Sequence, residues 1–198
     1  MRDTAVFVGS WLRAPGKTGA VWPSSRFLAR RLASVLEGHA EPTVAELGPG
    51  TGPTTAQIQH RLRGKGRHVA IDLNEEFVTR LRTRFPDVEV VCESAAELPR
   101  ILKDRDIGAV DAVISGLPFA AFPEGLQRDI LDAVVAALHP RHGVFTTFNY
   151  VGSYAFPPGE RFRRLLGERF SDVCVRGPEM RNFPPAHVLT ARGPRIAA

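Results

Sequence analysis

The residues with the clearest capacity for chemistry form a glycine turn and a separate acidic position. Residues 44–52 read Val-Ala-Glu-Leu-Gly-Pro-Gly-Thr-Gly, and a later apolar run ends in Asp72. Glycines let the backbone approach a ligand closely, and the Asp72 carboxylate can accept hydrogen bonds from two ribose hydroxyls. Because both features follow predicted strands, they would meet at the carboxyl edge of a parallel sheet. The pattern predicts a nucleoside cofactor at that edge.

Two further segments would reach the same edge. Residues 92–95 (Cys-Glu-Ser-Ala) follow the third predicted strand, and residues 115–119 (Ser-Gly-Leu-Pro-Phe) follow the fourth. Ligands bind outside the carboxyl ends of parallel strands. The segment after the fourth strand is therefore placed to form the pocket for the molecule that reacts with the cofactor.

The elements that would position these segments alternate between strand and helix. Helical patterns predict helices that begin near Ser24 or Ser25, Pro53 and Asn74, followed by helices at 124–138 and 160–170. We expect an α/β, Rossmann-like fold with a seven-stranded, mostly parallel sheet and helices on both faces. The predicted strands are residues 43–47, 68–71, 88–91, 109–114, 144–150, 173–176 and 187–191.

The composition fits one ordinary globular domain. The chain has 198 residues, of which 43% are hydrophobic and 24% charged, which is enough for a core of its own. Cys92 and Cys174 form neither a disulfide framework nor a metal-ligand pattern. We expect no secretory signal, because the apolar cluster at residues 5–8 is short, and no membrane-spanning segment. The net charge of +5 favours anionic partners, nucleic acid or lipid, although solubility explains it equally well.

The glycine spacing separates two cofactor classes. The turn is spaced G-x-G-x-G, whereas dinucleotide-binding turns are spaced G-x-G-x-x-G, so NAD fits less well. With Glu46 two residues before the first glycine, the turn resembles the first motif of class I S-adenosylmethionine (SAM) methyltransferases. The resemblance implies that Glu46 lies near the methionine end of SAM, that Asp72 holds the ribose, and that residues 93–95 approach adenine. The cofactor contacts that it implies are Val21, Ser24, Ser25, Glu46, Gly48, Pro49, Gly50, Thr51, Asp72, Leu73, Ser94, Ala95, Ser115, Gly116 and Leu117.

The segment after the fourth strand argues against a nucleobase acceptor. It resembles the N-L/I-P-F/Y segment of methyltransferases that act on adenine amines, including ribosomal-RNA adenine dimethylases, in which an asparagine carbonyl accepts a hydrogen bond from the amine. Gly116 stands at the asparagine position of this chain, while Leu117, Pro118 and Phe119 remain. The missing amide weakens the nucleic-acid interpretation.

Four blocks together resemble the short bacterial phospholipid N-methyltransferases over nearly the whole chain. The blocks are residues 19–28, 46–52, 115–118 and 181–186. The resemblance implies stepwise methylation of phosphatidylethanolamine toward phosphatidylcholine, and relatives of these enzymes methylate ornithine lipids. It also implies a cytoplasmic protein that is held peripherally at the inner face of the cell membrane.

Residues 1–22 are expected to form an amphipathic segment ahead of a methyltransferase domain at residues 23–198. Phe7 and Trp11 recur at helical spacing, and the resemblance implies a helix that rests on an anionic membrane surface. Alternatively, Trp11 and Trp22 cover the cofactor cleft as a lid.

Candidate catalytic residues come from the strand ends and from the last of the four blocks. Methyl transfer to an amine needs alignment, exclusion of water and a deprotonated amine, and aromatic faces suit both the sulfonium and the cationic product. We take Tyr150, Ser115 and Asn182 as catalytic, with Tyr150 first because its hydroxyl can accept from the amine. The predicted substrate-binding residues are Phe119, Tyr154, Arg181 and Phe183, with Lys17 and Arg26 as alternatives to Arg181 for a lipid phosphate.

We expect no metal site and assign no general base. None of the six histidines has metal-ligand spacing or an evident partner. Two other functions stay open. One is a ribosomal-RNA adenine dimethylase-like enzyme, which the basic charge supports. The other is a membrane-associated protein that binds SAM without catalysis.

Overall fold

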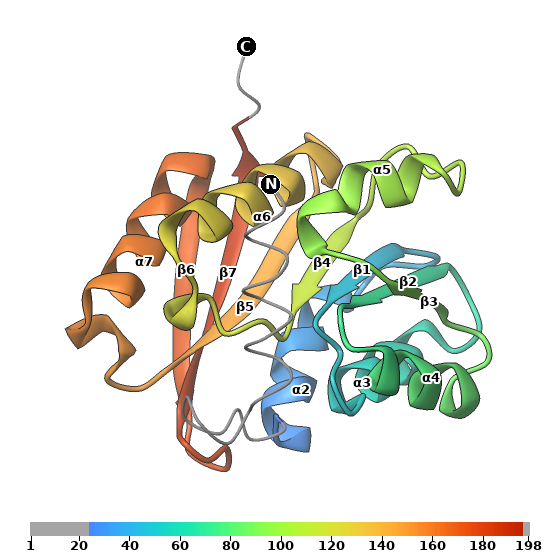
Figure 1. Cartoon of the computed structure of the whole chain (residues 1–198), viewed down its shortest axis with the longest axis horizontal. Helices are drawn as coiled ribbons and strands as arrows, with labels where there is room; N and C mark the ends of the chain where they lie inside the picture. The colour runs from blue at the N-terminus through green and yellow to red at the C-terminus, as the bar shows by residue number, and fades with distance from the viewer. Residues whose placement is uncertain (1–23, 196–198) are drawn as a thin grey trace.

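One mixed sheet organises the fold. The structure, a computed structural model, describes residues 24–195. The strands lie in the order β3-β2-β1-β4-β5-β7-β6 (Figure 1), and β7 runs antiparallel to both of its neighbours. The predicted seven-stranded, mostly parallel sheet is confirmed. The strands are β1 (Thr43–Leu47), β2 (Arg67–Asp72), β3 (Glu89–Cys92), β4 (Ala112–Ser115), β5 (Val144–Tyr150), β6 (Phe170–Glu179) and β7 (Ala186–Pro194).

Helices cover both faces of the sheet, as predicted. Apolar side chains are buried on both faces, which explains why β1 and β4 read as nearly continuous apolar runs. One face carries α2, α3 and α4, and the other carries α5, α6 and α7 (Figure 1). These helices are α2 (Arg26–Leu32), α3 (Pro53–Leu62), α4 (Glu75–Arg84), α5 (Leu98–Lys103), α6 (Glu124–Ala137) and α7 (Pro157–Arg169).

The helix starts follow the capping rules that predict them. Ser25 caps α2, and its hydroxyl accepts the Leu28 N–H at 3.2 Å. Asn74 caps α4 by accepting two backbone N–H groups at 2.9 and 3.3 Å. Pro53 occupies the first turn of α3, where its missing N–H costs nothing. These local signals place α3 and α4 directly after the two motifs that they support.

Some boundaries differ from the prediction. β4 begins at Ala112 rather than at residue 109, because the Val110 N–H donates instead to the Ala137 carbonyl at 2.9 Å. The sequence pattern did not reveal α5, since a helix of 6 residues is too short to show helical periodicity. β6 and β7 extend well beyond residues 173–176 and 187–191 and form a long hairpin.

The predicted amphipathic helix at residues 1–22 lies outside the described residues. The division of the chain at residue 22 therefore stays a prediction. Within residues 24–195, no helix combines the length and the apolar character that crossing a bilayer requires.

Candidate active site

The glycine turn and the loop after β4 are built against each other at the carboxyl edge of the sheet. Gly48 has a φ of +66°, and a Cβ there would lie 2.5 Å from the Leu117 side chain. A Cβ on Gly116 would lie 2.6 Å from the Gly48 carbonyl oxygen, while the Gly116 N–H donates to the Leu47 carbonyl at 2.8 Å. This close approach of two backbones gives a physical reason for glycine where the adenine-specific enzymes carry asparagine.

Asp72 is oriented toward the same turn. It ends β2, and it is only 6% exposed. One carboxylate oxygen accepts the Gly50 N–H at 3.0 Å, and the other accepts the Asn74 N–H at 2.9 Å. Burial raises the pKa of Asp72, and the backbone hydrogen bonds oppose that rise. Each oxygen keeps further acceptor capacity, which is what a ribose diol needs.

Glu46 is buried beneath the turn, and its polar contacts come from residues that the sequence alone did not single out. The Thr55 hydroxyl donates to its Oε2 at 2.8 Å, and His68 Nε2 lies 3.1 Å from the same oxygen. Gln59 Nε2 lies 3.0 Å from His68 Nδ1. The expectation that no histidine has an evident partner is therefore wrong. The strand register holds the missing signal, because Glu46 pairs with Ala70 and position 68 shares that face of the sheet.

The arrangement fits the predicted cofactor. A Cβ on Gly50 would meet no heavy atom of the described residues within 4 Å, so none of them crowds this part of the turn. Asp72 reaches the same place through its hydrogen bond to Gly50. The second oxygen of Glu46, Oε1, is buried and has no hydrogen-bond partner in the part of the chain that the structure describes, and a bound ligand can satisfy it. An open turn, a ribose acceptor and an orphaned acidic oxygen together suit SAM.

The third cofactor segment lies at the end of β3. Ser94 caps the short 3-10 helix η2 (Ala95–Glu97), and its hydroxyl accepts the Ala96 N–H at 3.3 Å. Glu93 is paired with Arg100 of α5. The segment therefore has a fixed conformation at the predicted position, and its contact with adenine stays a prediction.

The predicted acceptor side of the site combines the ends of β4 and β5. Ser115 is fully buried, and its hydroxyl accepts the Leu117 N–H at 3.2 Å. The Tyr150 ring meets Phe148 edge-on, with ring centroids 5.2 Å apart. Burial raises the pKa of Tyr150 above its ordinary value of 10.0. Its hydroxyl therefore stays protonated at neutral pH, so it can orient an amine but is unsuited to deprotonating one.

β5 also carries buried polar side chains that the sequence analysis missed. Thr146 Oγ1, Thr147 Oγ1 and Asn149 Nδ2 are buried without a hydrogen-bond partner among residues 24–195. An unpaired buried polar group costs about 1–3 kcal/mol, so these atoms need an explanation. Asn149 lies next to Tyr150, at the carboxyl end of the strand, where a ligand can reach it. The presence of polar residues inside an otherwise apolar strand was the sequence signal that could have identified them.

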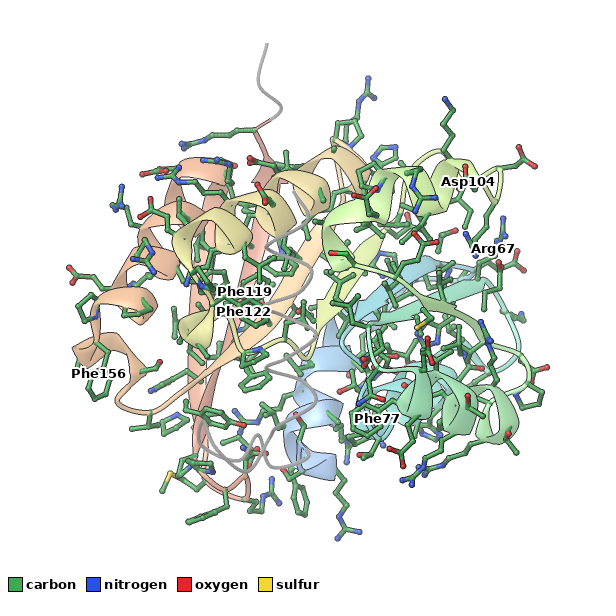
Figure 2. All side chains as sticks on the ribbon, viewed as in Figure 1. Arg67, Phe77, Asp104, Phe119, Phe122 and Phe156 are labelled. Carbon is green, nitrogen blue, oxygen red and sulfur yellow. The ribbon has the colours of Figure 1, made fainter. Side chains whose placement is uncertain are left out.

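Phe119, a predicted substrate contact, packs in the core. Its ring is 0% exposed. It stacks on Phe162 with ring centroids 4.3 Å apart and meets Phe145 edge-on at 6.1 Å. Figure 2 shows it beside Phe122, whose ring also meets it edge-on. The aromatic residue after Leu-Pro therefore closes the loop onto α7, and its contact with substrate stays a prediction.

The block at residues 181–186 is joined to the start of α2. The buried Asn182 accepts the Ser25 N–H at 2.8 Å through its side-chain oxygen, and its amide donates to the Pro184 carbonyl at 2.7 Å. Both the oxygen and the nitrogen of this side-chain amide form hydrogen bonds to backbone groups, so Asn182 positions the loop. Its direct part in catalysis stays a prediction.

The two predicted substrate-binding residues of this block lie at the surface. Arg181 Nε donates to Glu179 at 3.1 Å, and its guanidinium lies 3.9 Å from the centroid of the Phe27 ring. Phe183 is 73% exposed. Both side chains are accessible from solvent at the carboxyl side of the sheet, and their contact with substrate stays a prediction.

Three predicted contacts fall outside the described part of the structure. They are Lys17, Val21 and the side chain of Tyr154. Among the residues that the structure describes, no group of three or more His, Cys, Asp or Glu side chains is arranged to hold a metal ion.

Comparison with known proteins gives both a family and a full-length relative. Residues 44–141 match the family described as Methyltransferase domain. The ornithine lipid N-methyltransferase of Singulisphaera acidiphila is 33% identical over 98% of this chain and 97% of its own length. The ribosomal RNA small subunit methyltransferase A of Geobacter metallireducens is 28% identical over 68% of this chain and 51% of its own length.

Solved structures share the fold. An O-methyltransferase from Bacillus cereus in complex with SAH aligns with a TM-score of 0.65 over 96% of this chain and 89% of its own, at 14% identity. A precorrin-6y C5,15-methyltransferase from Geobacter metallireducens aligns with a TM-score of 0.62 over 84% of this chain and 87% of its own, at 19% identity. At these identities the likeness concerns the fold alone, and the acceptor must be argued from the site.

Proposed function

The chain belongs to the class I SAM-dependent methyltransferases, and on that premise we propose that it methylates the amine of a membrane lipid. The observation that carries the proposal is the similarity to an ornithine lipid N-methyltransferase along essentially the whole of both chains. The ribosomal RNA methyltransferase is similar over a smaller part of this chain and about half of its own length. Similarity over the full length covers the residues of the acceptor side, whereas similarity in the cofactor turn alone does not.

Gly116 supports a lipid amine over a nucleobase. An asparagine at this position would place its Cβ 2.6 Å from the Gly48 carbonyl oxygen. The chain must therefore orient its amine with other groups. We assign this role to Tyr150 and Asn149 at the end of β5, with Ser115 on the neighbouring strand.

Alignment is the main task of the chain's own residues. When bound, SAM supplies a methyl group on a sulfonium that is already a good leaving group. Asp72 and the glycine turn hold the cofactor end, which fixes the direction from which the amine must approach. The protonated Tyr150 hydroxyl accepts one N–H of the amine through an oxygen lone pair, which leaves the nitrogen lone pair free for the methyl group. No base is assigned, so the amine enters in its neutral form.

The identity of the head group is a finer part of the proposal. Phosphatidylethanolamine and its methylated intermediates, leading to phosphatidylcholine, carry an amine close to a phosphate, and ornithine lipids carry an amine without one. We propose that either head group is reached from the cytoplasmic side of the cell membrane, with residues 1–22 in peripheral contact with lipid. Arg181, at the surface of the acceptor side, is our candidate for the lipid phosphate.

Methyl-labelled SAM tests the proposal with three acceptors. We would incubate the purified protein with ornithine-lipid liposomes, with phosphatidylethanolamine liposomes and with ribosomal RNA, and use Asp72→Ala as the inactive control. Label in either lipid supports the proposal, and the better lipid names the head group. Label in RNA alone refutes it in favour of an RNA methyltransferase, the second candidate, which the partial relative and the net charge of +5 favour. SAM binding by calorimetry with no label in any acceptor would instead indicate a non-catalytic SAM-binding protein.

A further inference from the structure

The loop that joins β6 to β7 exposes large apolar side chains. Met180 is 69% exposed and Phe183 is 73% exposed, the two highest values among the large hydrophobic residues that the structure describes. Both lie within residues 179–185, which we call the hairpin tip. Neighbouring exposed apolar side chains at one projecting loop are a feature of interaction surfaces.

The hairpin tip is fixed to α2. Glu179 is 3% exposed, and its carboxylate lies 2.7 Å from Arg31 Nε of α2 and 3.1 Å from Arg181 Nε. The hydrogen bond from Arg181 holds the pKa of Glu179 below its ordinary value, so both ion pairs persist at neutral pH. A loop held in this way presents its two exposed apolar side chains with little further ordering cost on binding.

Arginines surround the hairpin tip. Arg26 and Arg30 are exposed on α2, on the side away from its buried apolar residues. Arg26 and Arg181 both lie over the Phe27 ring, with guanidinium-to-centroid distances of 4.8 and 3.9 Å. A groove of about 870 Å³ between α2 and α3 continues this basic surface, and its lining includes Arg61, Arg63 and Lys65.

This surface borders the edge of the sheet at which methyl transfer would occur. Tyr150, the last residue of β5, pairs with Ala186, and the Val151 N–H donates to the Pro185 carbonyl at 2.8 Å. The hairpin tip therefore starts where β5 ends and projects beyond the carboxyl edge. In Figure 1 the end of the hairpin and α2 lie next to each other at the bottom of the view. A lipid in a bilayer bound there would have its head group close to the acceptor side.

We propose that α2 and the hairpin tip form a docking surface for an anionic lipid bilayer, separate from residues 1–22. Met180 and Phe183 enter the boundary between head groups and acyl chains, while Arg26 and Arg30 bind lipid phosphates. The inference deepens the proposed function. It rests on the proposed function to explain why the protein binds a membrane, whereas the membrane binding itself is argued from the surface alone.

A bilayer fits this surface better than a second copy of the chain does. Two copies meeting through it would bring their arginines together, and the acid at the hairpin tip, Glu179, is already buried and paired. Like charges across an interface oppose association. An anionic bilayer offers phosphates to the arginines and an apolar layer to the two exposed side chains at the same time.

Co-sedimentation with vesicles of phosphatidylglycerol and phosphatidylcholine, without SAM, tests the docking directly. The test variants are Met180→Ser with Phe183→Ser, and Arg26→Gln with Arg30→Gln. Their matched controls are Val175→Ser, an exposed apolar residue within β6, and Arg80→Gln with Arg164→Gln, the same charge change on α4 and α7. We expect the partition coefficient to fall about tenfold for the apolar pair and roughly fivefold for each arginine. The controls should change it less than about twofold.

Three outcomes would overturn the proposal. The first is unchanged vesicle binding in both test variants, and the second is an equal loss in the controls. The third is a dimer in sedimentation velocity that the Met180 and Phe183 changes dissociate while vesicle binding is kept, which would make this surface an interface between copies. Thermal melting checks the folding of each variant. Arg30→Gln alone keeps the test valid if the apolar pair fails to fold.

An activity assay separates this proposal from the proposed function. Met180→Ser with Arg30→Gln should lose methyl transfer to lipid in vesicles and keep it on a short-chain amine lipid dispersed as monomers. Wild-type protein that binds vesicles as described but methylates no lipid would refute the proposed function and leave the docking surface standing. Lipid methylation on vesicles that is equal in the variant and in wild type would refute the docking surface alone.

Discussion

The two ends of the proposed active site differ in the groups that form them: backbone at the cofactor end and side chains at the acceptor end. The cofactor end is mostly backbone, because the Gly48 turn packs on Gly116 and the Gly50 N–H orients Asp72. The proposed acceptor end consists mostly of side chains from β4, β5 and the hairpin. It includes buried polar atoms on β5, such as Asn149 Nδ2, without a hydrogen-bond partner among the described residues.

This difference explains why one end reveals the family and the other does not reveal the substrate. Where two backbones approach closely, only glycine fits, so the geometry leaves a short pattern in the sequence. A pocket made of side chains can be assembled from many residue types on the same strands, and it leaves no such pattern. Substitutions should therefore affect cofactor binding and stability at one end, and turnover at the other.

The largest expected effect lies at the cofactor end. Asp72→Ala removes the acceptor for two ribose hydroxyls, and each hydrogen bond to a charged group is worth about 1.5–3 kcal/mol. SAM affinity should fall roughly hundredfold or more, measured by isothermal titration calorimetry. Asp111→Ala is the matched control, because Asp111 also accepts a backbone N–H, that of Thr43 at 2.8 Å, but at the opposite edge of the sheet. Unchanged SAM binding in Asp72→Ala would remove the cofactor site from the account.

The next largest effect is on stability, and it distinguishes a glycine with no room for a Cβ from one with room for it. Gly116→Ala places a Cβ 2.6 Å from the Gly48 carbonyl oxygen, so the free energy of unfolding should fall by about 1–3 kcal/mol. Gly125→Ala in α6, where a Cβ meets no atom of residues 24–195 within 4 Å, should leave the free energy of unfolding unchanged or raise it by up to about 1 kcal/mol. Denaturant unfolding measures both values. Equal stabilities would show that the two loops are not in close contact.

At the acceptor end, we expect a loss of turnover with SAM affinity retained. Tyr150→Phe removes one hydrogen bond, worth about 0.5–1.5 kcal/mol, so kcat should fall roughly two- to tenfold. Asn149→Ala should behave in the same way. Steady-state kinetics with the best lipid acceptor, combined with calorimetry, separate the two quantities. A parallel loss of SAM affinity would assign the end of β5 to the cofactor and break the comparison between the two ends.

The smallest expected effect is a pH dependence at the cofactor end. Burial raises the pKa of Asp72 above 3.8, and ribose binding uses its ionised form, so SAM affinity should fall as the pH drops through that raised pKa. For the stability of the protein without SAM, the pH dependence has the opposite sign. The stabilising contribution of Asp72 is full below its unfolded pKa and is lost as the pH rises through the folded pKa. Calorimetry from about pH 7 down to about pH 4 measures the affinity. An affinity that is constant over this range would contradict the ribose role.

Sequence prediction of the fold worked best where the rules are local. β1 and β5 occupy the predicted residues, and Ser25 and Asn74 cap the predicted helices, because strand runs and caps depend on adjacent residues. The length of the β6–β7 hairpin was not predictable in this way. It depends on pairing between strands rather than on a pattern within either strand.

For the site, the sequence did not reveal contacts that depend on residues distant in the chain. The pairing of Glu46 with His68 requires the register of β1 against β2. The burial of Phe119 requires α7, because its ring stacks on Phe162. The hydrogen bond from the Ser25 N–H to Asn182 was likewise invisible, since it joins the hairpin tip to the start of α2. Each case needs the assembled fold.

The most direct test of the lipid assignment is the lipid composition of bacterial cells that express the chain. Mass spectrometry of lipid extracts should show amine-containing lipids that carry one or more added methyl groups with wild-type protein. Cells that express Asp72→Ala at equal abundance should lack them, because we expect that variant to bind SAM roughly hundredfold more weakly or worse. Unmethylated lipids in both cultures, together with label transferred from SAM to ribosomal RNA by the purified wild-type protein, would contradict the account.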